Sequence, residues 1–233
     1  MQYNEDIKQE INKIENLEER NNELKKEKNE LKHKMEKIAL NMHQIRKKEA
    51  EELSKEINSN LQDLEMKNAK INVHVDYIED EFFSTGKDKI EIYISTNIGE
   101  DEKELSKIAS GGEMSRVMLA IKTVIANTDK MPILVFDEID TGISGKAANK
   151  VAEKLSKIAK MHQVLCISHL PNIAAIADYN YFISKNVKNE RTNTNIKLLN
   201  ENEVINEIAR ISSGEINDAT IKYATELRNK KAC

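Results

Sequence analysis

The sequence predicts an α/β domain that follows a long helical arm. Residues 1–70 contain neither glycine nor proline and carry a heptad pattern of apolar residues. The later chain holds short apolar runs of strand length, of which 133–136 is the clearest. These runs alternate with amphipathic helical patterns, which is typical of a largely parallel sheet covered by helices. We therefore expect two parts, a coiled-coil arm over 1–70 and an α/β domain over 71–233.

The composition fits an extended arm beside a modest core. The 233 residues are enough for one domain with an appendage, and 33% charged with 4% aromatic residues is too polar for a single globule. The net charge of -4 gives no general argument for nucleic-acid binding, so a basic patch would have to be local. Cys166 and Cys233 form neither a disulfide framework nor a zinc pattern, which favours a reducing cytoplasm. The sequence also predicts no signal peptide and no membrane span.

The arm is predicted to be one helix of a coiled coil. With Ile7 at heptad position a, the seam contains Ile7, Ile14, Met35 and Met42 at a, and Leu17, Leu24, Leu31, Ile38 and Ile45 at d. A seam of this length needs a partner helix, because isolated helices gain little from propensity alone. Glu10, Asn21 and Lys28 interrupt it, and Asn21 at an a position would fix the register. An isolated charged helix is the alternative.

The segment after the arm predicts a β-hairpin. Apolar residues alternate with polar ones over 71–77 and again over 90–94, and residues 84–87 supply turn chemistry. His74 falls on the polar side of the first strand. We interpret it as a surface histidine, since no second His or Cys lies at metal-ligand spacing.

The segment Ser110-Gly111-Gly112-Glu113 opens a predicted helix. Glycines let the backbone approach a ligand closely, and a helix N-terminus presents free N–H groups that suit a phosphate. The helical spacing that follows is carried by Met114, Val117, Met118, Ile121 and Ile125. An ordinary capping box between Ser110 and Glu113 is the alternative.

Two carboxylates follow the apolar run 133–136, which we expect to be a strand buried on both faces. Open α/β sheets place ligands at the carboxyl ends of their strands. There Asp137 would hold Mg²⁺, and Glu138 would orient or deprotonate a water. A solvated acidic turn is the alternative. His169 follows a second buried strand, 164–167, at the same edge, and spacing alone leaves a ligand contact and a loop histidine equally open.

The remaining elements complete the α/β pattern. We expect helices over 147–158, 173–177, 203–209 and 218–228, and late strands over 179–184 and 196–199.

Three segments resemble motifs of one ATPase class. The segment ASGGEMSRVMLAIK resembles the signature of ABC-type ATPases, ILVFDEIDTGIS resembles their Walker B strand and D-loop, and VLCISHLPNIAAIAD resembles their switch-histidine segment. The sequences of these segments are most similar to the RecN family, the SMC-like ATPases of bacterial DNA repair. The resemblance covers nearly the whole chain and corresponds to the carboxyl-terminal half of that family. It implies the second lobe of an ABC/SMC-type P-loop NTPase head, preceded by a coiled-coil arm.

The resemblance also implies roles for particular residues. ATP and Mg²⁺ would lie between two heads, with Ser110, Gly111, Gly112 and Glu113 of one head facing the P-loop of the other. Asp137 would serve Mg²⁺, Glu138 would be the general base, Asp140 would signal across the dimer and His169 would sense the γ-phosphate. The implied task is double-strand break repair by a cytoplasmic, nucleoid-associated protein that contacts DNA.

The sequence lacks the phosphate-binding loop that this chemistry requires. The nearest match to G-x-x-x-x-G-K-[ST] is Gly145-Lys146. It fails at both ends, because Asp140 stands where the motif needs its first glycine and Ala147 stands where it needs Ser or Thr. We therefore expect the chain alone to be inactive and to need an amino-terminal lobe that carries Walker A. A non-enzymatic coiled-coil assembly fragment is one alternative. An ABC transporter ATPase is another, although the long heptad arm argues against it.

Overall fold

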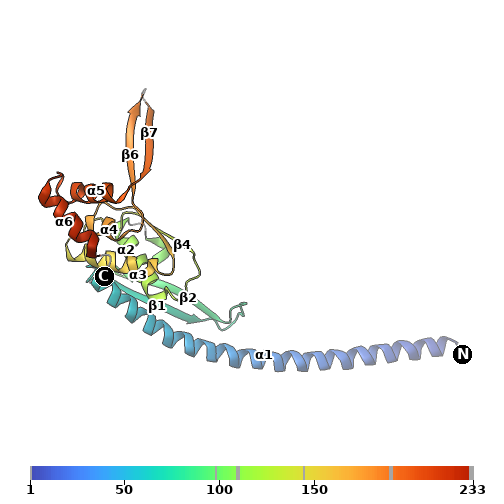
Figure 1. Cartoon of the computed structure of the whole chain (residues 1–233). Helices are drawn as coiled ribbons and strands as arrows, with labels where there is room; N and C mark the ends of the chain where they lie inside the picture. The colour runs from blue at the N-terminus through green and yellow to red at the C-terminus, as the bar shows by residue number, and fades with distance from the viewer. Residues whose placement is uncertain (1, 98, 109–110, 144, 189–190, 231–233) are drawn as a thin grey trace. The chain divides into compact units, whose positions relative to one another are not determined.

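The computed structural model of the chain describes residues 2–97, 99–108, 111–143, 145–188 and 191–230 (Figure 1). The chain divides into two compact units, one made of Met1–Glu52 and Val73–Glu91, the other of Leu53–Asn72 and Ile92–Cys233. Its elements, in order, are α1 Gln2–Asp63, β1 Lys70–Tyr77, β2 Asp88–Ser95, β3 Lys103–Glu104, the 3-10 turn η1 Leu105–Lys107, α2 Gly112–Ile125, β4 Ile133–Phe136, α3 Lys146–Ala159, β5 Gln163–Cys166, α4 Pro171–Ile176, β6 Tyr181–Lys188, β7 Arg191–Leu198, α5 Glu201–Ser213 and α6 Asp218–Asn229. This is the predicted α/β organisation, with the long helix first. Within the described ranges no helix is long and apolar enough to cross a membrane.

Helix α1 ends at Asp63, earlier than the predicted boundary near residue 70. The chain turns because Glu65 takes a left-handed conformation with φ of 59°, and the Met66 N–H bonds back to the Leu61 carbonyl at 3.0 Å. A left-handed residue at a helix end satisfies carbonyls that the last turn leaves free. No glycine marks this stop, so the sequence did not reveal it.

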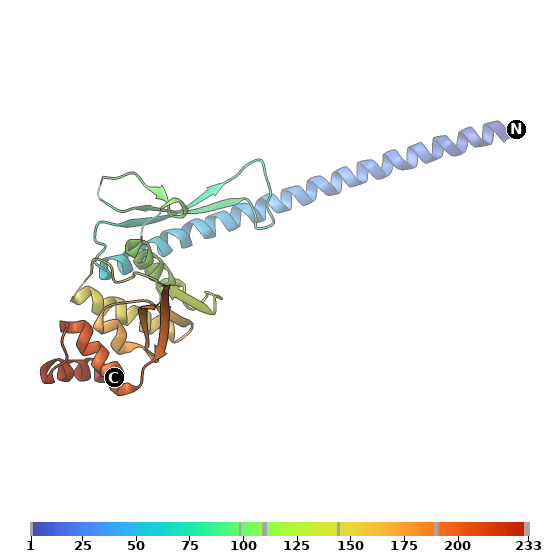
Figure 2. The same ribbon diagram turned by 90° about the horizontal axis from the view of Figure 1, so that it is seen from above.

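The first unit consists of the amino-terminal part of α1 and the segment 73–91, which lies along the helix (Figure 2). Two small residues of α1, Ala39 and Ala50, are buried. Strands β1 and β2 are neighbours in the three-stranded sheet β1-β2-β3, which confirms the predicted hairpin. His74 is exposed, as predicted.

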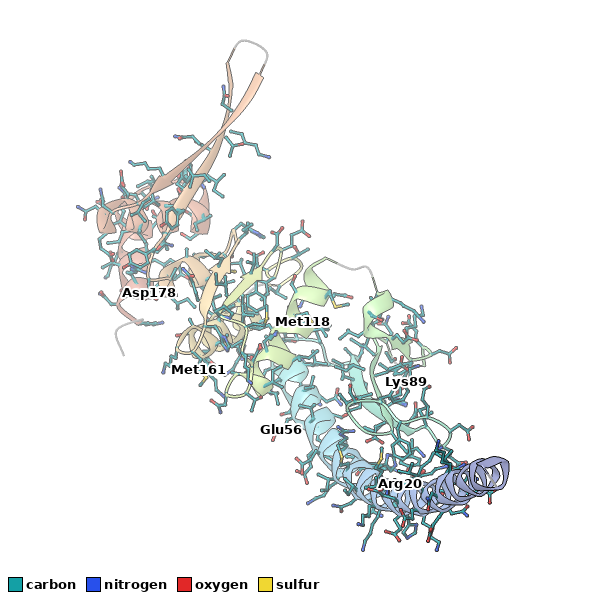
Figure 3. All side chains as sticks on the ribbon, turned by 90° about the vertical axis from the view of Figure 1, so that its right-hand side faces the viewer. Arg20, Glu56, Lys89, Met118, Met161 and Asp178 are labelled. Atoms are coloured by element: carbon teal, nitrogen blue, oxygen red, sulfur yellow. The ribbon has the colours of Figure 1, made fainter. Side chains whose placement is uncertain are left out.

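The second unit contains the main core. It is formed by the end of α1, by Ile71 of β1 and Ile94 of β2, and by α2, β4 and α3. Its fully buried side chains include Ile57, Leu61, Leu64, Ile71, Ile94, Val117, Leu119, Ile139, Val151 and Ile158. The helical spacing predicted for α2 and α3 is confirmed, because one stripe of each helix enters this core. Figure 3 shows the side chains of the unit, with Met118 labelled on α2 and Met161 just after α3.

Strands β4 and β5 pair in parallel, with Val135 opposite Leu165. The prediction that residues 133–136 are buried on both faces was wrong. Leu134 and Phe136 are buried, whereas Ile133 and Val135 are 48% and 65% exposed. Among the described residues β4 pairs only with β5. The exposed side chains of Ile133, Val135 and Leu165 show that one face of this small sheet has no covering layer within the described part of the chain.

The carboxyl-terminal part contains the antiparallel hairpin β6–β7 and two packed helices (Figure 1). The strands extend further toward the tip than the apolar pattern predicts, because polar residues continue the pairing. Helices α5 and α6 each begin with a capping box, at Asn200 and Asn217, and Gly214 ends α5 in the left-handed conformation with φ of 82°. Val204, Ile208, Ala209, Ala224 and Ala175 of α4 form the second core cluster.

Candidate functional site

The amino-terminal end of α2 lies against the loop that follows β4. A Cβ atom added at Gly112 would lie 2.6 Å from the Glu138 carbonyl oxygen and 2.7 Å from Thr141 Cβ. At Gly111 an added Cβ would meet the Glu138 carboxylate, 2.7 Å from Oε2. Gly112 is therefore needed for close packing within this chain, whereas the space beside Gly111 is closed only by the end of a flexible side chain.

Gly111 is the N-cap residue of α2, and no side chain caps the helix at that position. Glu113 lies in the first turn. Ser110 lies outside the described residues, so both its predicted ligand contact and the capping-box alternative stay predictions.

The two predicted carboxylates lie directly after β4, and both are exposed. Glu138 has a φ of 53°, which non-glycine residues seldom adopt. Its carbonyl accepts a hydrogen bond from the Thr141 N–H at 3.1 Å, and this closes a tight turn. Such backbone conformations gather at functional sites, where the surrounding structure holds them in place.

Two side chains of α2 hold this turn. Ser115 Oγ donates to the Asp137 carbonyl at 2.6 Å, and Arg116 Nη1 donates to the Thr141 carbonyl at 2.7 Å. Arg116 is only 7% exposed, and burial lowers the pKa of its guanidinium while Glu113 opposes that shift. The Nε atom of Arg116 has no partner within the described structure. The glycine segment and the carboxylate turn thus form one packed unit.

Asp140 lies one residue beyond the buried Ile139, and its side chain is 2% exposed. Its Oδ2 accepts hydrogen bonds from Ser168 Oγ and, at 2.7 Å, from the His169 N–H. The same oxygen lies 3.2 Å from Nδ1 of His169, whose side chain is 72% exposed. The segment after β5 is therefore fastened to the segment after β4.

The structure brings the described predicted site residues to one end of the β4–β5 pair, as strand order led us to expect. It adds Ser115, Arg116 and Ser168, which sequence reasoning did not select. In the sequence these three residues are marked only by their position next to the motif residues. Each donates a hydrogen bond to a backbone carbonyl or a carboxylate that is distant in sequence, and the sequence does not show such a bond. Cys166 lies at the end of β5, where burial, with Asp140 and Asp137 nearby, raises its pKa to about 12. A thiol with so high a pKa stays protonated at neutral pH.

The fit to a magnesium ion depends on what joins Asp137. Within the described ranges no group of three His, Cys, Asp or Glu side chains could hold a metal. Mg²⁺ is commonly bound by one or two carboxylates together with waters and substrate phosphates. Asp137, exposed at the end of β4, fits as one oxygen ligand of such a set.

Comparison with known proteins identifies relatives of the chain. No protein-family model matches it. It is 39% identical to the DNA repair protein RecN of Bacillus subtilis over 242 residues, covering 97% of this chain and 42% of that protein. With the DNA repair protein RecN of Halalkalibacterium halodurans the identity is 37%, over 97% of this chain and 41% of the relative. A RecN of Treponema pallidum is 46% identical over 61% of the chain and 25% of the relative.

Solved structures that resemble the chain are SMC head domains. The Smc head domain with a coiled coil and joint from Pyrococcus yayanosii has a TM-score of 0.49 at 20% identity, over 72% of this chain and 30% of that one. The SMC head domain from Thermotoga maritima has a TM-score of 0.34 at 20% identity, over 64% of this chain and 47% of that one. The identity with the curated proteins carries the assignment: the chain is related to the RecN DNA repair proteins along 97% of its length, consistent with their carboxyl-terminal part, and spans about two fifths of the length of the relatives named first.

Proposed function

We propose that the chain is the second lobe of an ATP-hydrolysing head that serves recombinational repair of DNA double-strand breaks. The observation that carries the proposal is the packing of Gly111 and Gly112 against the turn of Glu138, with His169 fastened to the same turn through Asp140. The relation to RecN proteins supports the repair task. The cytoplasm, at the nucleoid, is the compartment that such a task requires.

Each motif residue then has a defined role. Glu138 acts as the general base that takes a proton from the attacking water, and its exposed carboxylate is free to reach one. Asp137 supplies an oxygen ligand to Mg²⁺, which when bound stabilises charge on the phosphates. Ser110, Gly111 and Gly112 face the nucleotide held by a second head, and Glu113 lies beside them in the first turn. His169 contacts the terminal phosphate.

The lobe needs a partner for this chemistry, because the lysine and hydroxyl of a P-loop are absent from the sequence. We propose that an amino-terminal lobe carrying Walker A packs on the uncovered face of β4 and β5. The apolar residues exposed on that face support this partner, since patches of this kind mark interaction sites. They are Ile133, Val135, Leu165 and Ile167.

The test of the proposed function is Glu138→Gln in the complete protein with both lobes. The amide keeps the shape of the side chain and loses the base, so turnover should fall by about 10²–10⁴ while ATP binding persists. Dimers of heads should accumulate with ATP and be visible by size-exclusion chromatography. A hydrolysis rate near that of the unmodified protein would show that Glu138 is not the base.

A further inference from the structure

We infer that Asp140 is a positioning residue that sets the orientation of the His169 ring within its own chain. The inference rests on the proposed function, because it concerns how the histidine is held ready for a phosphate. It differs from the role that the family resemblance implies, in which Asp140 acts across a head dimer.

Burial of the carboxylate carries the first step. The Asp140 side chain is 2% exposed, so it has almost no surface to offer to a second head. A buried carboxylate requires hydrogen-bond donors, and those that Asp140 receives come from the segment after β5. They are the Ser168 hydroxyl and the His169 N–H.

The second step concerns the ring itself. Nδ1 of His169 lies 3.2 Å from Asp140 Oδ2, and a carboxylate only accepts, so Nδ1 must carry the proton for this pair to bond. A partner on one ring nitrogen fixes the tautomer and orients the other. Nε2 is left as the atom available to a ligand, on a side chain that is 72% exposed.

A comparison with Ser168 separates positioning of the ring from simple attachment of the loop. Ser168 bonds the same carboxylate and also accepts from the Leu170 N–H at 3.0 Å, so it fastens the loop without touching the ring. Ser168→Ala therefore removes a loop contact and leaves the Asp140–His169 pair. Asp140→Asn keeps an acceptor for the backbone N–H but loses the charge and one of its two oxygens.

The experiment has two arms. The first records ring ¹⁵N spectra of the 233-residue chain at a pH high enough for the neutral ring to be observed, with His169 assigned from a His169→Gln spectrum. We expect the Nδ1–H tautomer in the unmodified chain and in Ser168→Ala, and loss of that preference in Asp140→Asn. An Nε2–H tautomer in the unmodified chain would overturn the inference, and this arm needs no ATPase activity.

The second arm measures ATP hydrolysis by the complete two-lobed protein. Loss of an orienting partner typically costs about 10- to 100-fold. We expect kcat to fall by about that factor in Asp140→Asn, with little change in KM for ATP, and to fall by clearly less in Ser168→Ala. Equal losses of kcat in the two variants would mean that Asp140 only holds the loop in place, and would reject the inference. Absence of hydrolysis in the unmodified protein would count against the proposed function, while the tautomer still decides the role of Asp140.

Discussion

Gly111 and Gly112 occupy neighbouring positions at the start of α2 but meet different obstacles. The space beside Gly112 is closed by a backbone carbonyl and by Thr141 Cβ, neither of which can move without shifting the turn. The space beside Gly111 is closed by the end of the Glu138 side chain, which can rotate away. Gly112 is therefore required by the fold, whereas Gly111 leaves room for the Glu138 carboxylate in its present position.

This difference predicts opposite outcomes for two alanine substitutions. Gly112→Ala should destabilise the chain by about 1–3 kcal/mol, the usual cost of overpacking, as measured by urea unfolding. Gly111→Ala is the matched control and should unfold near the normal midpoint. In the complete protein Gly111→Ala should nevertheless slow hydrolysis, because Glu138 is displaced. Similar midpoints for both variants would contradict the packing described at Gly112.

The sequence identified the motif residues but not the contacts that hold them. The glycine pair and the acidic pair stand out because few other structures need those residues together at a helix start and a strand end. The left-handed φ of Glu138 and the bond from Arg116 to Thr141 depend on the approach of segments about 25 residues apart. No local pattern encodes such an approach, so these features required the structure.

At the scale of elements, α1 has two distinct faces in the first unit, one exposed and one buried. The heptad seam is exposed, as the prediction of a partner helix requires, with Leu17, Leu24, Leu31, Ile38 and Ile45 between 47% and 69% accessible. A different stripe, containing Ala39 and Ala50, is covered by the β1–β2 segment. The sequence did not predict this second face, because alanines and charged residues carry it instead of large apolar side chains.

A charged cluster joins the hairpin to that second face. The Lys87 side chain is 2% exposed, donates to Glu36 Oε1 at 3.0 Å and lies 4.6 Å from the centre of the Phe82 ring. Asp88 accepts from Arg46 at 2.7 Å and lies 2.7 Å from His43 Nδ1. Burial alone would raise the pKa of Asp88, but hydrogen bonds from Arg46 and His43 outweigh it and lower the pKa below its usual range.

The lowered pKa of Asp88 predicts a pH-dependent stability. A carboxyl whose pKa is lower in the folded state stabilises the fold above its unfolded value of about 4, and this contribution disappears as the pH falls through the folded pKa. Asp88→Asn removes the titration. The unmodified chain should therefore be more stable than Asp88→Asn at neutral pH, and the difference should shrink on acidification.

Urea midpoints of both chains at several pH values test this expectation. Glu81→Gln, which changes an exposed carboxylate in the loop between β1 and β2, is the control and should give little difference at any pH. A gap between the unmodified chain and Asp88→Asn that stays constant or widens toward acid would show that Asp88 is not stabilised as described.

At the scale of the whole molecule, the uncovered surfaces explain where sequence reasoning about burial failed. The run 133–136 has the composition of a strand buried on both sides, and that composition is accurate for a sheet with two covering layers. The described residues of this chain supply only one such layer. The hairpin β6–β7 repeats the situation, since the facing pairs Tyr181–Leu198 and Ile183–Ile196 have all four side chains at least 50% exposed. Periodicity reports what a strand is suited to contact, and cannot say which polypeptide supplies the contact.

The missing P-loop predicts that the chain alone binds ATP weakly and does not hydrolyse it. In the proposed function the signature segment and the two carboxylates would contact only part of a nucleotide, and the groups that hold the β- and γ-phosphates are absent from the sequence. Titration calorimetry of the chain with ATP and Mg²⁺ should give no saturable heat in the micromolar range. A micromolar dissociation constant would reveal a nucleotide site that is complete without a partner.

The uncovered face of β4 and β5 leads to the last prediction, which concerns assembly. Val135 is 65% exposed in this chain, so Val135→Lys should leave its unfolding midpoint nearly unchanged. If an amino-terminal lobe packs on this face, the same lysine would be buried without a partner at the interface, and burying an unpaired charge is strongly unfavourable. Co-expression with the amino-terminal portion of a RecN protein should then give a complex with the unmodified chain and none with Val135→Lys. Ile216→Lys, which changes a comparably exposed residue between α5 and α6, is the control and should still form the complex. Capture of the amino-terminal portion by Val135→Lys at the normal yield would place the second lobe on a different surface and leave the apolar face of β4 and β5 unexplained.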